Sequence, residues 1–293
     1  MSPMYAILDQ KVISPGVTKT VIAVPRIAKK RKPGQFVILR LYEKGERIPL
    51  TIADADPERG TITVISQNVG KSTAYLKHMK VSDEILDVVG PLGHPTHIEL
   101  FGHVVCIGGG IGIAPLYPIA QGMKNAGNRV TSIIGARTKG LLILEEEMRS
   151  VSDDLAISTD DGSYGEKGFV SDILKKRVED GERFDKAVVI GPVPMMRVMT
   201  LLTKSYNIPT VVSLNSIMVD GTGMCGACRV TVDGTTKFTC VDGPEFDGFQ
   251  VDFDELIHRL KMFDNLNVQA RADYEEKHKN PHCAVREESH GDE

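Results

Sequence analysis

The chain has 293 residues, 41% hydrophobic and 25% charged, which is an ordinary globular composition and long enough for two domains. Its 35 basic and 39 acidic residues leave a net charge of −4, which argues against binding to nucleic acid or to an anionic membrane. No apolar run approaches a membrane span, and the first residues lack the features of a signal peptide. Cys106 and Cys283 stand apart from the other cysteines, so we expect no disulfide framework and a cytoplasmic location.

Residues 1–100 predict a small antiparallel β barrel. Short runs rich in valine and isoleucine are separated by turn-forming pairs such as Pro15-Gly16 and Arg59-Gly60. The expected strands are 5–8, 17–24, 35–41, 61–66 and 84–89, with one helix over 72–79.

Two segments of the predicted barrel are suited to phosphate groups. Arg47–Thr51 combines a cation, a stiff apolar stretch and a hydroxyl, and Gly70–Thr73 begins the expected helix with N–H donors. A Walker A loop is excluded, because Ile65 stands where its upstream glycine would be. By composition alone, a solvated surface residue is the simpler interpretation of Arg47.

Residues 101–215 predict a parallel sheet buried on both faces, because strands and helices alternate. The expected strands are 103–107, 129–135, 155–159, 186–190 and 209–214, and the expected helices are 115–125, 142–150, 170–178 and 194–204. A further helix is expected over 253–262, in a C-terminal region 251–293. Its charged tail, 273–293, is interpreted as a frayed end or a partner-binding arm.

Three loops follow strands of this predicted sheet: Gly108–Pro115, Thr159–Gly168 and Gly191–Met195. Ligands of open α/β sheets bind beyond the carboxyl ends of the strands, so the loops together indicate one extended dinucleotide. Each loop taken alone is also explained as a tight turn, and G-x-G-x-x-G is not met to the letter. Arg137 follows the second strand and suits a 2′-phosphate, but a lone arginine there is usually solvated. The sequence leaves open whether the dinucleotide is NAD or NADP.

The most specific motif is Asp220-Gly-Thr-Gly-Met-Cys225-Gly-Ala-Cys228, followed by Cys240. Plant-type [2Fe-2S] proteins use C-x4-C-x2-C and a distant fourth cysteine, and here Asp220 occupies the first position. A hairpin turning at Asp233-Gly234 would return Cys240 to the loop. Residues 216–250 therefore predict a cluster with one oxygen ligand. The alternatives are half of a zinc ribbon, which lacks a fourth ligand at knuckle spacing, and a thioredoxin-like dithiol, which belongs at a helix start.

In this order the motifs resemble the ferredoxin-reductase superfamily. More narrowly, they are similar to the electron-transfer subunit of dihydroorotate dehydrogenase and to the small subunit of NADH-dependent ferredoxin:NADP oxidoreductase, an enzyme also called sulfide dehydrogenase. The resemblance covers residues 5 to about 262. It implies an FAD-binding barrel (1–100), an NAD(P)-binding α/β domain (101–215) and a small [2Fe-2S] loop domain (216–250).

The resemblance also assigns contacts, and it implies no side-chain general base. The FAD contacts would be Arg47, Pro49, Leu50, Thr51, Gly70, Lys71, Ser72, Thr73, Gly90, Pro91 and Gly93. The dinucleotide contacts would be Gly108, Gly109, Gly110, Gly112, Ala114, Pro115, Asp160, Asp161, Gly162, Gly191, Pro192 and Met195, with Arg137 as a further candidate. The cluster ligands would be Asp220, Cys225, Cys228 and Cys240.

Two departures from the family pattern bear on function. Ile190 stands where the family often has a cysteine near the nicotinamide, and Asp220 is similar to the bifurcating reductase branch. The resemblance implies an electron relay from NAD(H), with NADP(H) not excluded, through FAD and the cluster to a larger flavin and iron–sulfur subunit. That heterodimer would reach ferredoxin through its larger subunit. The alternatives are the electron-transfer subunit of an NAD-linked dihydroorotate dehydrogenase and a non-catalytic flavoprotein module with structural zinc.

Overall fold

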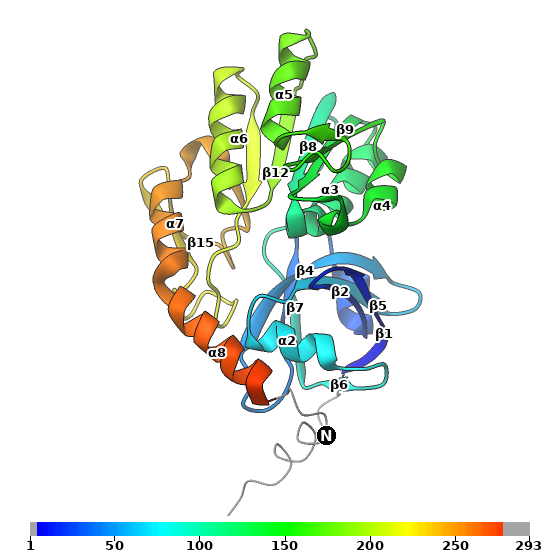
Figure 1. The fold of residues 1–293 in the computed structure, drawn as a ribbon, viewed down its shortest axis with the longest axis vertical. Coiled ribbons are helices and arrows are strands. Elements are labelled where there is room, and N and C mark those ends of the chain that lie inside the picture. The colour runs from blue at the N-terminus through cyan, green and yellow to red at the C-terminus, as the bar shows by residue number, and fades with distance from the viewer. Residues whose placement is uncertain (1–4, 278–293) are drawn as a thin grey trace, which may run out of the picture.

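The structure is a computed structural model that describes residues 5–277 (Figure 1). Its first part is an antiparallel sheet in the order β6-β1-β2-β5-β4-β3-β7. The strands are β1 (Tyr5–Ser14), β2 (Val17–Ala23), β3 (Phe36–Arg40), β4 (Arg47–Asp56), β5 (Thr61–Gln67), β6 (Glu84–Ile85) and β7 (Asp87–Leu92). Only Leu86 separates the two edge strands β6 and β7 in the chain, so the sheet curls into a nearly closed barrel.

Five runs were expected to be barrel strands, and all five are present, the last one divided at Leu86. The centre of the barrel is filled by aliphatic side chains that are at most 1% exposed: Ile7, Ile22, Leu39, Ile52 and Ile62. The expected helix is α2 (Lys71–His78). Strand β4 and the short helix α1 (Pro25–Lys30) were not predicted. Both contain proline, which weakens the periodic pattern on which such predictions depend.

The second sheet is parallel apart from one edge, in the order β11-β10-β9-β8-β12-β13-β16. Its strands are β8 (His103–Gly109), β9 (Arg129–Ala136), β10 (Asp154–Thr159), β11 (Glu166–Lys167), β12 (Lys186–Ile190), β13 (Thr210–Ser213) and β16 (Glu245–Asp247). The helices between them are α3 (Ile113–Asn125), α4 (Glu145–Ser150), α5 (Val170–Glu179) and α6 (Val193–Ser205). Strands β9 and β12 lie on opposite sides of β8, so the direction of travel across the sheet reverses between β8 and β12.

Helices cover both faces of this sheet, as the alternation predicts. Val104 and Cys106 of β8 pack with α3 and α4, whereas Val105 and Ile107 pack with α5 and α6. The α3 face also receives Ala53 of the barrel, so the barrel and the sheet share one apolar cluster. The two sheets are therefore joined by packing as well as by the chain.

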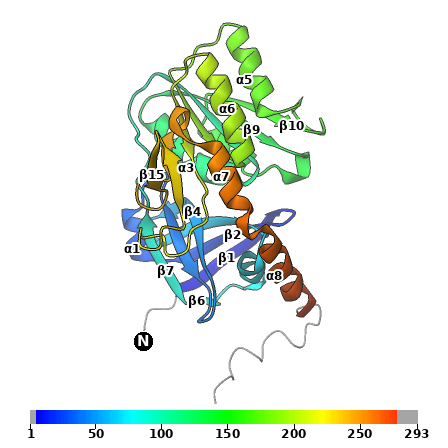
Figure 2. The same ribbon diagram turned by 90° about the vertical axis from the view of Figure 1, so that its left-hand side faces the viewer.

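The cysteine loop lies between β13 and β16, and its hairpin is β14 (Arg229–Val232) and β15 (Thr235–Phe238). Asp233 and Gly234, with φ of 50° and 66°, form the predicted turn. Helix α7 (Phe253–Leu260), the 3-10 turn η4 (Lys261–Phe263) and helix α8 (Asp264–Lys277) then run down one side of the molecule (Figures 1 and 2).

The interpretation of 273–293 as a frayed end is wrong for residues 273–277, which belong to α8, whereas the alternative of a partner-binding arm stays a prediction. Most of α8 is exposed, but Tyr274 is 5% exposed and its ring stacks on His78 of α2, with centroids 6.2 Å apart. This anchor lies in a polar segment, which explains why the sequence pattern did not indicate a helix. Residues 278–293, including Cys283, lie outside the described residues. Over residues 5–277, no helix is both long and apolar enough to cross a membrane.

Candidate electron-transfer site

The turn after β8 packs directly on the turn after β12, at the point where strand order reverses. A Cβ on Gly112 would overlap the Ile190 carbonyl oxygen and would lie 2.7 Å from Gly191 Cα. A Cβ on Gly109 would overlap the sulfur of Met195. No side chain caps the N-terminus of α3 or of α6, so their N–H groups suit phosphate oxygens. Backbone atoms of the two turns thus touch without intervening side chains, at the edge of the sheet where open α/β folds bind ligands.

The predicted dinucleotide loops all end at this same edge of the sheet. The Asp161 N–H donates to the Arg137 carbonyl oxygen at 3.2 Å, which joins the turns after β9 and β10. The Asp161 carboxylate accepts from the Ser163 N–H at 2.9 Å, and hydrogen bonds from Ser163 lower the pKa of that carboxyl. The turns at this edge of the sheet therefore contain all the predicted dinucleotide contacts: Gly108, Gly109, Gly110, Gly112, Ala114, Pro115, Arg137, Asp160, Asp161, Gly162, Gly191, Pro192 and Met195. Ala114 is only 2% exposed and packs in the cluster shared with the barrel.

The two predicted phosphate segments of the barrel meet at the start of α2. Ser72 Oγ donates to Glu46 Oε2 at 2.6 Å, which ties the residue before Arg47 to the first turn of the helix. Thr73 Oγ1 accepts from the Gly70 N–H at 3.1 Å. The buried Oδ1 atom of Asn68, just before this turn, has no hydrogen-bond partner among the described residues. An unsatisfied acceptor beside a helix N-terminus fits a polar cofactor that supplies the missing donor.

The loop Gly90–Gly93 lies beside the cysteine loop. The backbone is left-handed at Gly93, with φ of 78°, where a Cβ would lie 2.9 Å from both Phe36 Cε1 and Pro244 Cδ. A cavity of about 310 Å³ separates this loop from the cysteine loop, and it is lined by Pro91, Leu92, Gly93, His94, Gly221, Thr222, Cys240 and Val241. This predicted flavin-edge loop is therefore also a wall of the cysteine site.

The four predicted cluster ligands meet as two pairs. Cys225 Sγ lies 3.1 Å from Asp220 Oδ1, and Cys228 Sγ lies 3.2 Å from Cys240 Sγ. Cys228 and Cys240 are each 1% exposed and pack on Phe36 and Ile38 of the barrel, whereas Cys225 is exposed. Among residues 5–277, no three or more His, Cys, Asp or Glu side chains surround a single metal position. Two separate pairs suit a two-iron cluster better than one structural zinc, which needs four convergent ligands.

The charges within the loop are consistent with ligand roles. The hydrogen bond from the Cys225 thiol is the largest of several that hold the pKa of Asp220 well below its usual range. Its carboxylate also accepts from the Met224 N–H at 2.9 Å and from Thr222 Oγ1 at 3.0 Å. Burial raises the pKa of Cys240 to about 12, so a cationic metal is what would hold it as a thiolate.

Glu245, which the sequence did not single out, lies at the junction of the barrel and the second sheet. Its Oε1 accepts from Thr96 Oγ1 at 2.5 Å, and a Cβ on Gly34 would meet both groups. Burial raises the pKa of its carboxyl from 4.5 to about 7, although the Thr96 hydrogen bond and the Lys186 charge oppose the rise. Glu245 and Thr96 are 149 positions apart in the chain, so sequence spacing gave no signal for this contact.

The protein is expected to lose stability as the pH rises, in part because Glu245 must ionise. A carboxyl whose pKa is higher in the folded state stabilises that state at low pH, and the contribution disappears as the pH rises through about 7. The unfolding free energy of the wild type should fall by roughly 3 kcal/mol between about pH 4.5 and pH 8 because of this group, and Glu245→Gln should not show that fall. Urea unfolding across this range measures it, with Glu276→Gln on exposed α8 as the control. Equal pH profiles for Glu245→Gln and the wild type would contradict this role.

Two parts of the chain match known protein families. Residues 106–200 match the oxidoreductase NAD-binding domain, and residues 215–252 match the iron–sulfur cluster binding domain of dihydroorotate dehydrogenase B. The barrel, the parallel sheet and the cysteine loop define an oxidoreductase subunit of the ferredoxin-reductase type with NAD-binding and iron–sulfur domains.

Individual relatives place the chain within this class. The dihydroorotate dehydrogenase B (NAD(+)), electron transfer subunit homolog of Thermotoga maritima is 54% identical over 239 residues, covering 82% of this chain and 84% of the relative. The corresponding electron transfer subunit of Geobacillus thermodenitrificans is 33% identical over 254 residues, covering 84% of this chain and 96% of the relative. The chain belongs to the family of dihydroorotate dehydrogenase B electron-transfer subunits and their homologues.

Solved structures extend the comparison. The NADH-dependent reduced ferredoxin-NADP oxidoreductase, whose structure was described for flavin-based electron bifurcation, gives a TM-score of 0.86 at 48% identity, covering 92% of this chain and 98% of that chain. A ferredoxin NADP+ reductase from Neisseria gonorrhoeae with bound FAD and NADP gives 0.57 at 19% identity, covering 69% and 90%, which shows the fold alone. The predicted fold class and family resemblance are confirmed, while the individual contact residues stay predictions.

Proposed function

We propose that this chain is the FAD- and [2Fe-2S]-carrying subunit of an electron-bifurcating NADH-dependent ferredoxin:NADP oxidoreductase. The observation that supports it most is the contact between Asp220 and Cys225, which favours a carboxylate as one of the cluster ligands. The 48% identity to the oxidoreductase described for bifurcation, over 98% of that chain, points in the same direction. The chain exchanges a hydride with NAD(H) and passes single electrons to a larger flavin and iron–sulfur subunit.

The residues of this chain have binding and positioning roles in that relay. The uncapped N-termini of α3 and α6 would hold the dinucleotide phosphates, and the backbone contact of Gly112 with Ile190 and Gly191 brings the starts of these two helices together. The N–H groups in the first turn of α2 would bind the flavin phosphates, and Asn68 Oδ1 would accept a hydrogen bond from a donor group elsewhere on the flavin. The pairs Asp220–Cys225 and Cys228–Cys240 would each hold one iron. When bound, flavin and cluster together convert hydride transfer into single-electron transfer, so the protein needs no general base.

Three exposed apolar side chains in and near the cysteine loop suit a protein partner. Val219 is 52% exposed, Met224 88% and Val241 40%, all within the matched iron–sulfur domain. Contiguous exposed apolar side chains commonly mark interaction sites. The larger subunit would dock on this surface, next to the exposed Cys225.

Anaerobic purification of the tagged chain from its own source tests the proposal. We expect a larger FAD protein with additional iron–sulfur clusters to co-purify, and the complex to reduce NADP+ with NADH and reduced ferredoxin. A smaller FMN protein that oxidises dihydroorotate would instead establish the second candidate function, which the dihydroorotate dehydrogenase names of the Thermotoga and Geobacillus relatives favour. Purified protein with zinc and no iron would contradict both.

Asp220→Cys is expected to retain the cluster but to change its reduction potential. The substitution exchanges a hard carboxylate oxygen for a softer, more electron-rich thiolate, which alters the electron density at the iron. Iron content should differ from that of the wild type by no more than about 10%. Potentiometric titration followed by EPR gives the potential, with Asp180→Cys, which adds a thiol at an exposed position just after α5, as the control. An unchanged potential would show that Asp220 is not a ligand.

A further inference from the structure

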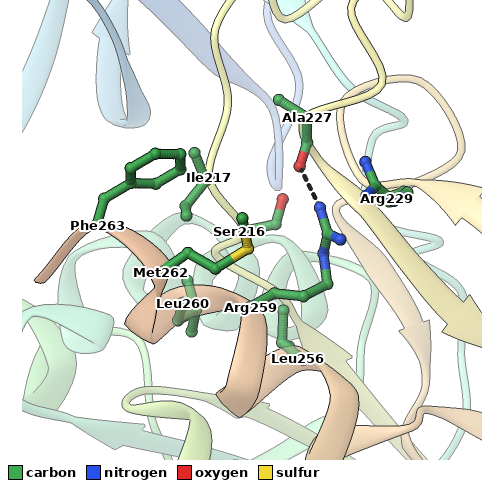
Figure 3. Close-up of a pocket in the computed structure, with 9 residues that line it drawn as sticks. All are labelled: Ser216, Ile217, Ala227, Arg229, Leu256, Arg259, Leu260, Met262 and Phe263. Carbon is green, nitrogen blue, oxygen red and sulfur yellow. Dashed lines mark hydrogen bonds between the residues drawn. The ribbon is translucent and has the colours of Figure 1, made fainter.

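A small cavity lies between the cysteine loop and helix α7. Its volume is about 150 Å³, and it is lined by Ser216, Ile217, Ala227, Arg229, Leu256, Arg259, Leu260, Met262 and Phe263. Figure 3 shows that Arg259 of α7 reaches across it to the backbone of the loop. The cavity therefore joins the loop to the helix that follows the iron–sulfur domain.

Two guanidinium groups bind consecutive carbonyl oxygens between Cys225 and Cys228. Arg229 Nη1 donates to the Gly226 carbonyl oxygen at 3.3 Å, and Arg259 Nη2 donates to the Ala227 carbonyl oxygen at 3.1 Å. Neither guanidinium forms an ion pair with a carboxylate in the part of the chain that the structure describes. Both guanidinium groups therefore bind peptide oxygens of the loop and not a side-chain carboxylate.

The first of these peptide groups also touches a predicted ligand. The Ala227 N–H, which belongs to the same peptide as the Gly226 carbonyl, donates to Cys225 Sγ at 3.5 Å. A cation on the carbonyl oxygen polarises the peptide and strengthens the N–H dipole that faces the sulfur. Hydrogen bonds to cluster sulfurs and nearby charge are among the factors that set iron–sulfur potentials.

Helix α7 is built to hold the loop in place. Asp252 N–H donates to the Thr231 carbonyl oxygen at 2.9 Å, and Glu255 Oε2 accepts from the Thr231 N–H at 3.0 Å. Glu255 and Arg259 lie one helical turn apart with opposite charges, yet each contacts the backbone of the iron–sulfur domain. Leu256, between them, is 1% exposed. The helix thus fixes the position of the Arg259 charge relative to the loop.

We infer that Arg229 and Arg259 are positioning residues that raise the reduction potential of the cluster bound by the loop. This inference rests on the proposed function, since it requires a cluster at Asp220, Cys225, Cys228 and Cys240. The cluster becomes more negative on reduction, so two fixed cations favour the reduced state. The charge is delivered through the peptide groups of Gly226 and Ala227, without contact between either arginine and the iron.

Potentiometric EPR titration of the purified full chain tests the inference. Arg229→Gln and Arg259→Gln should each lower the midpoint potential, and the double variant should lower it further, while iron content is retained. Arg259→Lys keeps the charge and should restore most of the wild-type potential. Arg271→Gln on α8 is the matched control, because its guanidinium pairs with Glu275 at 2.8 Å and should leave the potential unchanged.

The outcomes separate this inference from the proposed function. A wild-type chain with no iron and no EPR signal would overturn the proposed function itself. A wild-type cluster whose potential stays the same in both glutamine variants would overturn only the role of the arginines. Loss of iron in Arg259→Gln, with Arg259→Lys equally depleted, would show that Arg259 braces the loop and does not set the potential.

Discussion

Gly112→Ala is expected to destabilise the protein and to impair NADH oxidation more than any other single-methyl change in the turns after β8 and β12. The added Cβ would overlap the Ile190 carbonyl oxygen and lie 2.7 Å from Gly191 Cα. Both neighbours are backbone atoms, which cannot rotate away as a side chain does. The turns after β8 and β12 must then separate. We expect a loss of about 3 kcal/mol in unfolding free energy, which lowers Tm by roughly 6–12 °C.

Two further variants show whether the backbone contact is the cause. Gly140→Ala has open space around its Cβ and should leave Tm and NADH oxidation unchanged. Gly109→Ala meets the flexible Met195 side chain, so Met195→Ala in the same chain should recover its stability. Differential scanning calorimetry and NADH:ferricyanide assays measure both effects. A Tm for Gly112→Ala equal to that of Gly140→Ala would mean that the two turns do not pack as the structure has them.

The sequence could predict the sheets because their signals are local. Valine- and isoleucine-rich runs between turn pairs indicated the barrel, and alternating strands and helices indicated the parallel sheet. Strand β4 was not predicted, because Pro49 and the acidic residues of the strand break the pattern. Pro49 nevertheless pairs with Ile38 in the sheet. Helix α8 was not predicted, because its segment is polar and is anchored by one tertiary contact, that of Tyr274 with His78. Such contacts have no local signature.

Some contacts of the candidate site could also be predicted from local spacing, and others could not. Spacing alone predicted that Asp220 and Cys225 would lie together, and their side chains are in contact. Contacts between distant parts of the chain could not be found by spacing. Arg259 reaches the loop at Ala227 across 32 positions, and Thr96 reaches Glu245 at the junction of the two sheets across 149. The motif predicts the ligands, whereas contacts such as these depend on the packing of whole elements.

Cys228→Ala is expected to abolish the cluster while leaving the fold intact. Cys228 is 1% exposed and its sulfur lies 3.2 Å from that of Cys240, so its loss leaves one iron with a single protein ligand. Iron per chain should fall more than about tenfold, since cluster assembly requires the complete ligand set. NADH-dependent reduction of one-electron protein acceptors should fall at least as far, whereas NADH:ferricyanide activity, which bypasses the cluster, should persist.

Cys106→Ala provides the matched comparison, because it removes the same atom from an equally buried cysteine. Cys106 lies in β8, two strands away from β13, and packs in the apolar cluster beneath α3 and not in the cysteine loop. Its loss creates a small cavity that should cost about 1–2 kcal/mol of unfolding free energy, with iron content unchanged. If Cys228→Ala kept its iron and its EPR signal, the pairing with Cys240 would be a packing contact. The cluster, and with it the electron path out of this subunit, would then have to be sought elsewhere in the chain.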